Sequence, residues 1–116
     1  RAMANTSTVL PALGLGAFAV IARRAAVIIG NDSGLTHLAA AATRGASGDA
    51  RKVHVIYGGT DPFHTGPPGT TPHHSARPPC WPCYRKTCSF ARLAPCLDTE
   101  IATVQVAIQD ALQAQL

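Results

Sequence analysis

Apolar and polar positions along the first half of the chain predict a helix, a strand, a second helix and a second strand. Apolar residues recur at helical spacing over residues 15–25, and residues 26–29 form a short, wholly apolar run. Such a run is typical of a strand buried on both faces of a parallel sheet. An alanine-rich stretch from about residue 34 to residue 43 predicts the next helix, and residues 53–57 predict the second strand. This order predicts an α/β fold with a parallel sheet.

The second half of the chain has a different pattern. Residues 62–82 hold seven of the nine prolines and few aliphatic residues, which predicts an extended loop. From residue 99 onward, apolar positions at helical spacing predict an amphipathic helix, with Asp98 or Thr99 as its N-cap. We therefore expect one domain over residues 1–116, with a Pro- and Cys-rich loop insertion at 62–97 and a C-terminal helix at 98–114.

Length and charge narrow this interpretation. The 116 residues suffice for one small domain, and much of the apolar fraction that could form its core is alanine. The net charge of +4 suits an anionic partner without identifying it, and no apolar run reaches the 18 residues that a membrane span needs. Because the sequence enters mid-pattern at Arg1, we expect the C-terminal part of a longer protein.

The turn between the first strand and the second helix carries the clearest chemistry. Asp32, Ser33 and Gly34 stand there, and His37 follows one helical turn later. Unpaired N–H groups at a helix start favour an anion, so Ser33 and Gly34 are candidate phosphate ligands, and Asp32 could accept hydrogen bonds from sugar hydroxyls. In the plainer alternative, Asp32 or Ser33 only caps the helix and His37 is a half-buried histidine.

Several stretches resemble glycosyltransferase family 9, which contains the ADP-heptose:lipopolysaccharide heptosyltransferases. Residues 25–41 (AAVIIGNDSGLTHLAAA) resemble the signature of the family. Residues 55–62 (VIYGGTDP) resemble its strand followed by Gly-Pro-Thr-Asp-Pro, and residues 65–67 (TGP) resemble the motif that often comes next. The cysteine pattern is similar to that of a subset of members. The resemblance extends from about Leu13 to the terminal helix.

The resemblance implies most of the C-terminal, Rossmann-like, donor-binding half of a GT-B glycosyltransferase. In such an enzyme Asp32 would hold heptose hydroxyls, Ser33 and Gly34 would bind the diphosphate through backbone N–H groups, and His37 would lie beside it. Leu13 would form an apolar wall against adenine. The general base and a phosphate-contacting lysine of the family lie upstream, so we expect no catalytic residue in this chain.

The same resemblance implies the reaction and its setting. Heptose would pass from ADP-heptose to a lipopolysaccharide inner-core acceptor, with inversion and with no cofactor required. The enzyme would be cytoplasmic or peripheral at the inner membrane. A GT-B enzyme that uses a UDP- or GDP-sugar is an alternative, because a strand–turn–helix phosphate site does not identify the base.

Four cysteines within 17 residues form a second candidate site: Cys80, Cys83, Cys88 and Cys96. They could hold a structural zinc ion, form two disulfides or remain free thiols, and a reducing cytoplasm would keep them reduced. We expect them to staple a loop that has little hydrophobic core.

The loop that contains the cysteines is basic. Residues 63–97 contain four Arg or Lys side chains and no acid, with Trp81, Tyr84 and Phe90 interleaved. This pattern leaves open a non-catalytic Cys₄ module that contacts nucleic acid. We favour a solvated loop over that alternative.

Overall fold

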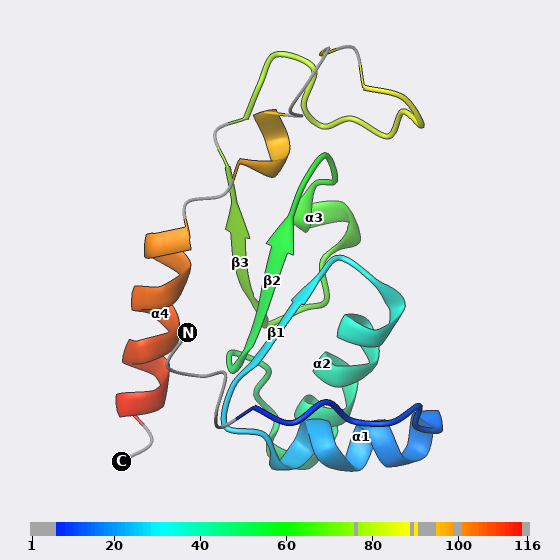
Figure 1. Ribbon diagram of the computed structural model, residues 1–116, viewed down its shortest axis with the longest axis vertical. Helices are drawn as coiled ribbons and strands as arrows, with labels where there is room; N and C mark the ends of the chain where they lie inside the picture. The colour runs from blue at the N-terminus through cyan, green and yellow to red at the C-terminus, as the bar shows by residue number, and fades with distance from the viewer. Residues whose placement is uncertain (1–6, 76, 89, 91–94, 99–100, 115–116) are drawn as a thin grey trace.

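A three-stranded parallel sheet lies at the centre of the computed structural model, which describes residues 7–75, 77–88, 90, 95–98 and 101–114 (Figure 1). The strands are β1 (Ile28–Asn31), β2 (Val53–Tyr57) and β3 (Thr71–His74), in that spatial order. Ile28 pairs with Val53 between β1 and β2, and His54 pairs with Thr71 between β2 and β3. The predicted α/β class with a parallel sheet is therefore confirmed.

Helices cover the sheet unevenly. In chain order they are α1 (Leu15–Arg24), α2 (Gly34–Ser47), α3 (Pro62–Thr65), the 3₁₀ turn η1 (Pro95–Leu97) and α4 (Ile101–Gln113). Helix α2 packs against β1 and β2, and α1 packs on α2. Helix α4 runs alongside β3, with Val104 buried (Figure 1).

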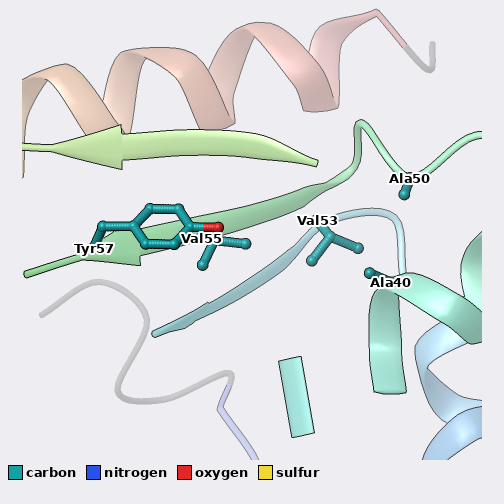
Figure 2. Packing of buried hydrophobic residues seen from close by; sticks show 5 residues of the cluster. All are labelled: Ala40, Ala50, Val53, Val55 and Tyr57. Carbon is teal, nitrogen blue, oxygen red and sulfur yellow. The ribbon is translucent and has the colours of Figure 1, made fainter. Parts of the chain in front are cut away.

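The hydrophobic core is small and centres on β2. Its members alternate along that strand and meet two alanines: Ala40, Ala50, Val53, Val55 and Tyr57 (Figure 2). Ile28 of β1 packs against this cluster. Because alanine contributes little apolar area, most of the core's burial free energy comes from the three β2 side chains.

Strand β1 differs from the prediction. It begins two residues later than expected and is half-buried rather than buried on both faces, since Ile29 is 52% exposed. The reason is its place at one edge of the sheet. The fully buried strand is β2, where Val53, His54, Val55 and Tyr57 are all buried.

Helix α2 extends four residues beyond the predicted end at Thr43 and stops at Gly48. Gly48 has φ 75°, a left-handed conformation that glycine adopts without the steric cost of a Cβ atom. Its N–H donates to the carbonyl oxygen of Arg44 at 2.7 Å, which closes the helix.

Strand β3 was not predicted, because its sequence, TPHH, lies in the proline-rich stretch. An edge strand tolerates Pro72, since the missing N–H need not face a neighbouring strand on that side. Helix α4 agrees with the predicted C-terminal helix, while the proposed cap Thr99 lies outside the described residues.

Lys52 fastens the end of α1 to the start of β2. Its ammonium group donates to the carbonyl oxygens of Ala22, Arg23 and Ala25 at 3.0, 2.9 and 2.6 Å. A helix C-terminus leaves such carbonyls unpaired and carries a partial negative charge, so one cation satisfies both needs.

We predict that Lys52→Met destabilises the fold by about 1.5–3 kcal/mol, the usual range for hydrogen bonds that involve a charged group. Urea unfolding followed by circular dichroism measures this. The matched control is Arg51→Met: Arg51 pairs with Asp49 at the surface, where its side chain is 83% exposed, and its loss should not change stability measurably. Equal effects of the two variants would contradict the role of Lys52.

Two histidines are buried on the face of the sheet opposite the core cluster. His54 Nδ1 and His73 Nε2 lie 2.9 Å apart, and the rings are stacked. Burial lowers the pKa of both histidines, and for His54 the neighbouring His73 lowers the pKa further. Nε2 of His54 is buried without a hydrogen-bond partner in the described part of the chain, so the pair is held in its neutral form.

This pair predicts a stability that falls with acidification. Below the ordinary histidine pKa of 6.5, the unfolded chain binds protons that the folded pair resists. The urea midpoint should therefore drop between about pH 7.5 and pH 5.5. A double variant, His54→Leu with His73→Leu, should lose this pH dependence, whereas the exposed-site control His64→Gln should keep it. A flat midpoint in the wild-type chain would contradict the prediction.

Candidate functional site

Two loops meet at one edge of the sheet, and Asp32 lies where they meet. Strand β1 ends at Asn31 and β2 ends at Tyr57, and Asn31 pairs with Ile56 in the sheet. Parallel strands bring their carboxyl ends together, so the turn 32–33 and the loop 58–61 lie side by side (Figure 1). Gly30 is required just before the turn, because a Cβ atom there would overlap the side chain of Thr36.

The carboxylate of Asp32 accepts three side-chain hydrogen bonds. Thr60 Oγ1 donates to Oδ2 at 2.8 Å and Thr65 Oγ1 donates to the same oxygen at 2.9 Å. His37 Nε2 lies 3.1 Å from Oδ1 and must be the donor, since an ionised carboxylate only accepts. The three donors come from the loop after β2, from α3 and from α2, so Asp32 connects three elements.

Burial is the largest single influence on Asp32 and on its own would raise the carboxyl pKa. The hydrogen bonds from Thr60, Thr65 and His37, with the charge of His37, outweigh it and hold the pKa of Asp32 below its ordinary value. The side chain of Asp32 is only 17% exposed, whereas that of His37 is 44% exposed. An ionised carboxylate with one accessible side is suited to accept hydrogen bonds from a neutral polyol.

Asp32 is not the N-cap of α2, so that part of the plainer alternative is wrong, while His37 is hydrogen-bonded and partly exposed as that alternative expects. The N-cap is Ser33, and Ser33 makes no side-chain capping bond; its hydroxyl lies 3.3 Å from that of Thr36. Among the described residues no side chain caps the first N–H groups of α2. The space around Gly34 is open as well, since a Cβ there would meet nothing within 4 Å. Ser33 is the N-cap and Gly34 the first residue of α2, and their role as phosphate ligands remains a prediction.

Two open hollows flank this turn. The first, which we call the Asp32 hollow, has a volume of about 300 Å³ and is lined by Asp32, Thr60 and the loop glycines. The second, the Ser33 hollow, has about 280 Å³ and is mainly apolar, with Phe18 and Leu35 in its wall. Three features therefore adjoin at this turn: the hollow at Asp32, the N–H groups at the start of α2, and the mainly apolar hollow at Ser33.

The family model for glycosyltransferase family 9 (heptosyltransferase) matches residues 1–94. The chain belongs to glycosyltransferase family 9. No curated protein and no solved structure matches it. A family 9 glycosyltransferase moves a sugar from a nucleotide-sugar donor to a glycan acceptor. None of the described helices is long and apolar enough to cross a membrane.

Leu13, which the family resemblance assigns to an adenine wall, precedes α1 and is 37% exposed. It is not among the residues that line the Ser33 hollow; Phe18 and Leu35 are. Its role in this family 9 chain therefore remains a prediction. The helical periodicity of residues 15–25 includes Phe18 but does not place it near the turn after β1. Its position in the wall of the Ser33 hollow follows from the packing of α1 on α2.

The cysteines of this family 9 chain line one further hollow of about 250 Å³, shared by Cys80, Cys83, Cys88 and Cys96. All four are free thiols. Within the described ranges, no three His, Cys, Asp or Glu side chains are arranged to hold a metal ion. A loop held together by its cysteines needs them around one hollow, as they are here. These described residues do not have the geometry of an ion site, so zinc remains a prediction.

The cysteine-containing segment covers the loop after β2. Trp81 Nε1 donates to the carbonyl oxygen of Gly58 at 3.2 Å, and the N–H of Cys83 donates to that of Gly59 at 2.6 Å. Side chains on these two glycines would collide with Leu97 and with the backbone of Cys83. The segment thus supports the loop that carries Thr60.

The basic side chains of that segment are spread out. Arg77 stacks on Trp81, with its guanidinium carbon 4.3 Å from the ring centroid, while Arg85 and Lys86 are exposed beside the cysteine hollow. Arg92 lies outside the described residues. Arg77 already covers the ring of Trp81, so this ring is not free to stack on a nucleic-acid base.

Sequence reasoning missed the hydrogen bonds that Thr60 and Thr65 donate to the candidate residue Asp32. Both belong to stretches that resemble the family, but no role was predicted for their hydroxyls. The rule that parallel strands end at one edge placed the loop 58–61 near Asp32. That rule does not predict that α3 brings the hydroxyl of Thr65 to Oδ2 of Asp32.

We predict that all four thiols of the native chain, purified without a reductant, react with a disulfide reagent without prior chelation. The exposed Cys80 and Cys88 should react before the half-buried Cys83 and Cys96. A spectrophotometric thiol count over time, with and without a zinc chelator, measures this. Thiols that react only after chelation would show a bound ion, and fewer than four after chelation would show disulfides.

Proposed function

We propose that this chain is the donor-binding half of a heptosyltransferase. In this proposal it binds ADP-heptose, and the heptose passes with inversion to a lipopolysaccharide inner-core acceptor. The observation that carries the proposal is the carboxylate of Asp32, held ionised directly before the open N-terminus of α2. It adds to the family membership, which supplies the reaction class.

The hollow at Asp32, the N-terminus of α2 and the hollow at Ser33 suit the three parts of an ADP-sugar. The diphosphate would bind the open N–H groups of Ser33 and Gly34, where the helix dipole favours negative charge. The sugar would lie over Asp32, which would accept hydrogen bonds from its hydroxyls and would repel a phosphate. The adenine would then fall toward the apolar Ser33 hollow, near Phe18 and Leu35.

His37 has a more limited role than the sequence suggested. Its Nε2–H is directed at Asp32, so contact with the diphosphate would have to use the other ring nitrogen. In the imidazolium form both nitrogens donate, and Nδ1–H could reach a phosphate oxygen while Nε2–H keeps Asp32 in place. The side chain is exposed enough for a ligand to reach it.

Departure of the diphosphate needs stabilisation of the negative charge that develops on the leaving group. The N-terminus of α2 supplies fixed N–H donors at that point, and the proposed transfer requires no metal ion. We assign no general base to these residues: the carboxylate of Asp32 is already bound by three donors and is placed for the sugar.

We further propose that the protein acts in the cytoplasm, at or near the inner membrane. A lipopolysaccharide core is anionic, and a net charge of +4 favours approach to an anionic acceptor or membrane surface. The basic segment from Arg77 to Lys86 supports this preference over an uncharged glycan. Nucleic acid is not proposed as a partner.

We predict that Asp32→Asn weakens binding of ADP-heptose by about tenfold, because a charge-assisted hydrogen bond to the sugar becomes a neutral one. Isothermal titration calorimetry of the chain with ADP-heptose measures the change. The matched control is Asp49→Asn, which alters a surface carboxylate paired with Arg51. Unchanged affinity in Asp32→Asn would contradict the proposed sugar contact.

Competition by free nucleotides tests the base. ADP should displace ADP-heptose more effectively than UDP or GDP does. Stronger competition by UDP or GDP would replace the assigned donor with another nucleotide-sugar, while the site on Asp32 and α2 would remain.

A further inference from the structure

The oxygens of the Asp32 carboxylate have different surroundings. Oδ2 accepts from both Thr60 and Thr65, at 2.8 and 2.9 Å, whereas Oδ1 has one partner among the described residues, His37, at 3.1 Å. A carboxylate offers about four lone-pair positions, two on each oxygen. The threonines therefore fill Oδ2, and one position on Oδ1 is left for a ligand.

The hydroxyl proton of Thr65 has two acceptors within reach. It lies 2.9 Å from Asp32 Oδ2 and 3.1 Å from the carbonyl oxygen of Asp61. One proton cannot make two full hydrogen bonds, and the shorter contact to the charged oxygen is the stronger. The bond to Asp32 therefore dominates, and the carbonyl of Asp61 mainly keeps the Thr65 side chain in its rotamer.

Both threonines are themselves held in place. Asp61 caps α3 by accepting from the N–H of Phe63 at 3.0 Å, which fixes the turn between Thr60 and Thr65. On the other side of Thr60, Gly58 and Gly59 are bound by Trp81 and Cys83. The two hydroxyls are therefore presented by a supported loop rather than by a free one.

We propose that Thr60 and Thr65 are positioning residues of the donor site: by filling Oδ2 they turn Oδ1 of Asp32 toward the sugar. This inference rests on the proposed function. It adds that the stretch after β2, and not only the turn after β1, decides sugar binding. Because one position on Oδ1 is free, Asp32 accepts a hydrogen bond from one hydroxyl of the sugar.

An electrostatic consequence accompanies this geometry. The diphosphate of a bound donor lies close to Asp32, and a second negative charge favours protonation of the carboxyl. The hydroxyls of Thr60 and Thr65 oppose that change, because each lowers the pKa of Asp32. They keep the carboxylate an acceptor while the donor is bound.

The experiment compares isosteric variants that lack one hydroxyl, Thr60→Val and Thr65→Val, with Thr60→Ser and Thr65→Ser, which keep it. The matched control is Thr71→Val, since the Thr71 hydroxyl donates to the carbonyl oxygen of Arg51, away from Asp32. Calorimetry measures affinity for ADP-heptose and for ADP, and carbon-detected NMR of labelled aspartate measures the pKa of Asp32. Thr60→Ala and Thr65→Ala replace any valine variant that does not fold by circular dichroism.

Each hydroxyl-deleted variant should bind ADP-heptose about tenfold more weakly, bind ADP nearly as before, and raise the pKa of Asp32. The serine variants should restore all three values, and Thr71→Val should alter none. A merely structural role would weaken ADP and ADP-heptose alike.

Two failures are distinguishable. A wild-type chain that binds ADP-heptose no better than ADP would overturn the proposed function and the donor role of these threonines with it. A wild-type chain with the expected preference, combined with unchanged sugar affinity or an unchanged Asp32 pKa in the hydroxyl-deleted variants, would overturn the positioning role alone.

Discussion

The hydrogen bonds that converge on Asp32 are the constraint on which the site depends. Asp32 immediately follows β1, Thr60 lies in the loop between β2 and α3, and Thr65 is the last residue of α3, so one carboxylate connects the segments that follow two neighbouring strands. A partly buried charge is costly unless it is bound. Any rearrangement that separated the two loops would leave that charge unsatisfied, which makes their spacing, and thus the opening above α2, well defined.

The sheet beneath this edge is stabilised by few large side chains. The core cluster contains Val53, Val55 and Tyr57 of β2, and elsewhere the chain relies on polar fastenings such as Lys52 at the end of α1. Strand β2 is the central strand of the sheet, and it carries the large side chains of this cluster. The loops of the candidate site, which lie directly after β1 and β2, therefore extend from the best-supported part of the sheet.

Much of the fold could be predicted, because helical and strand periodicity survive in residues 15–57 and in α4. Strand β3 could not, since neither Pro72 nor two histidines favour a strand, and an edge position with a stacked His54–His73 pair decides it. The four candidate residues Asp32, Ser33, Gly34 and His37 could be named from a local motif. Thr60 and Thr65 could not, because their contact with Asp32 spans 28 and 33 residues and depends on how α3 turns.

The cysteine-containing segment is connected with the site through the backbone rather than through its thiols. It binds the carbonyls of Gly58 and Gly59, the residues just before Thr60, and side chains on either glycine would displace it. Support of this kind needs a fixed loop, and four thiols around one hollow could fix it by an ion or by disulfides. Any link formed between these thiols would therefore act on the candidate site indirectly, by fixing the loop that carries Thr60.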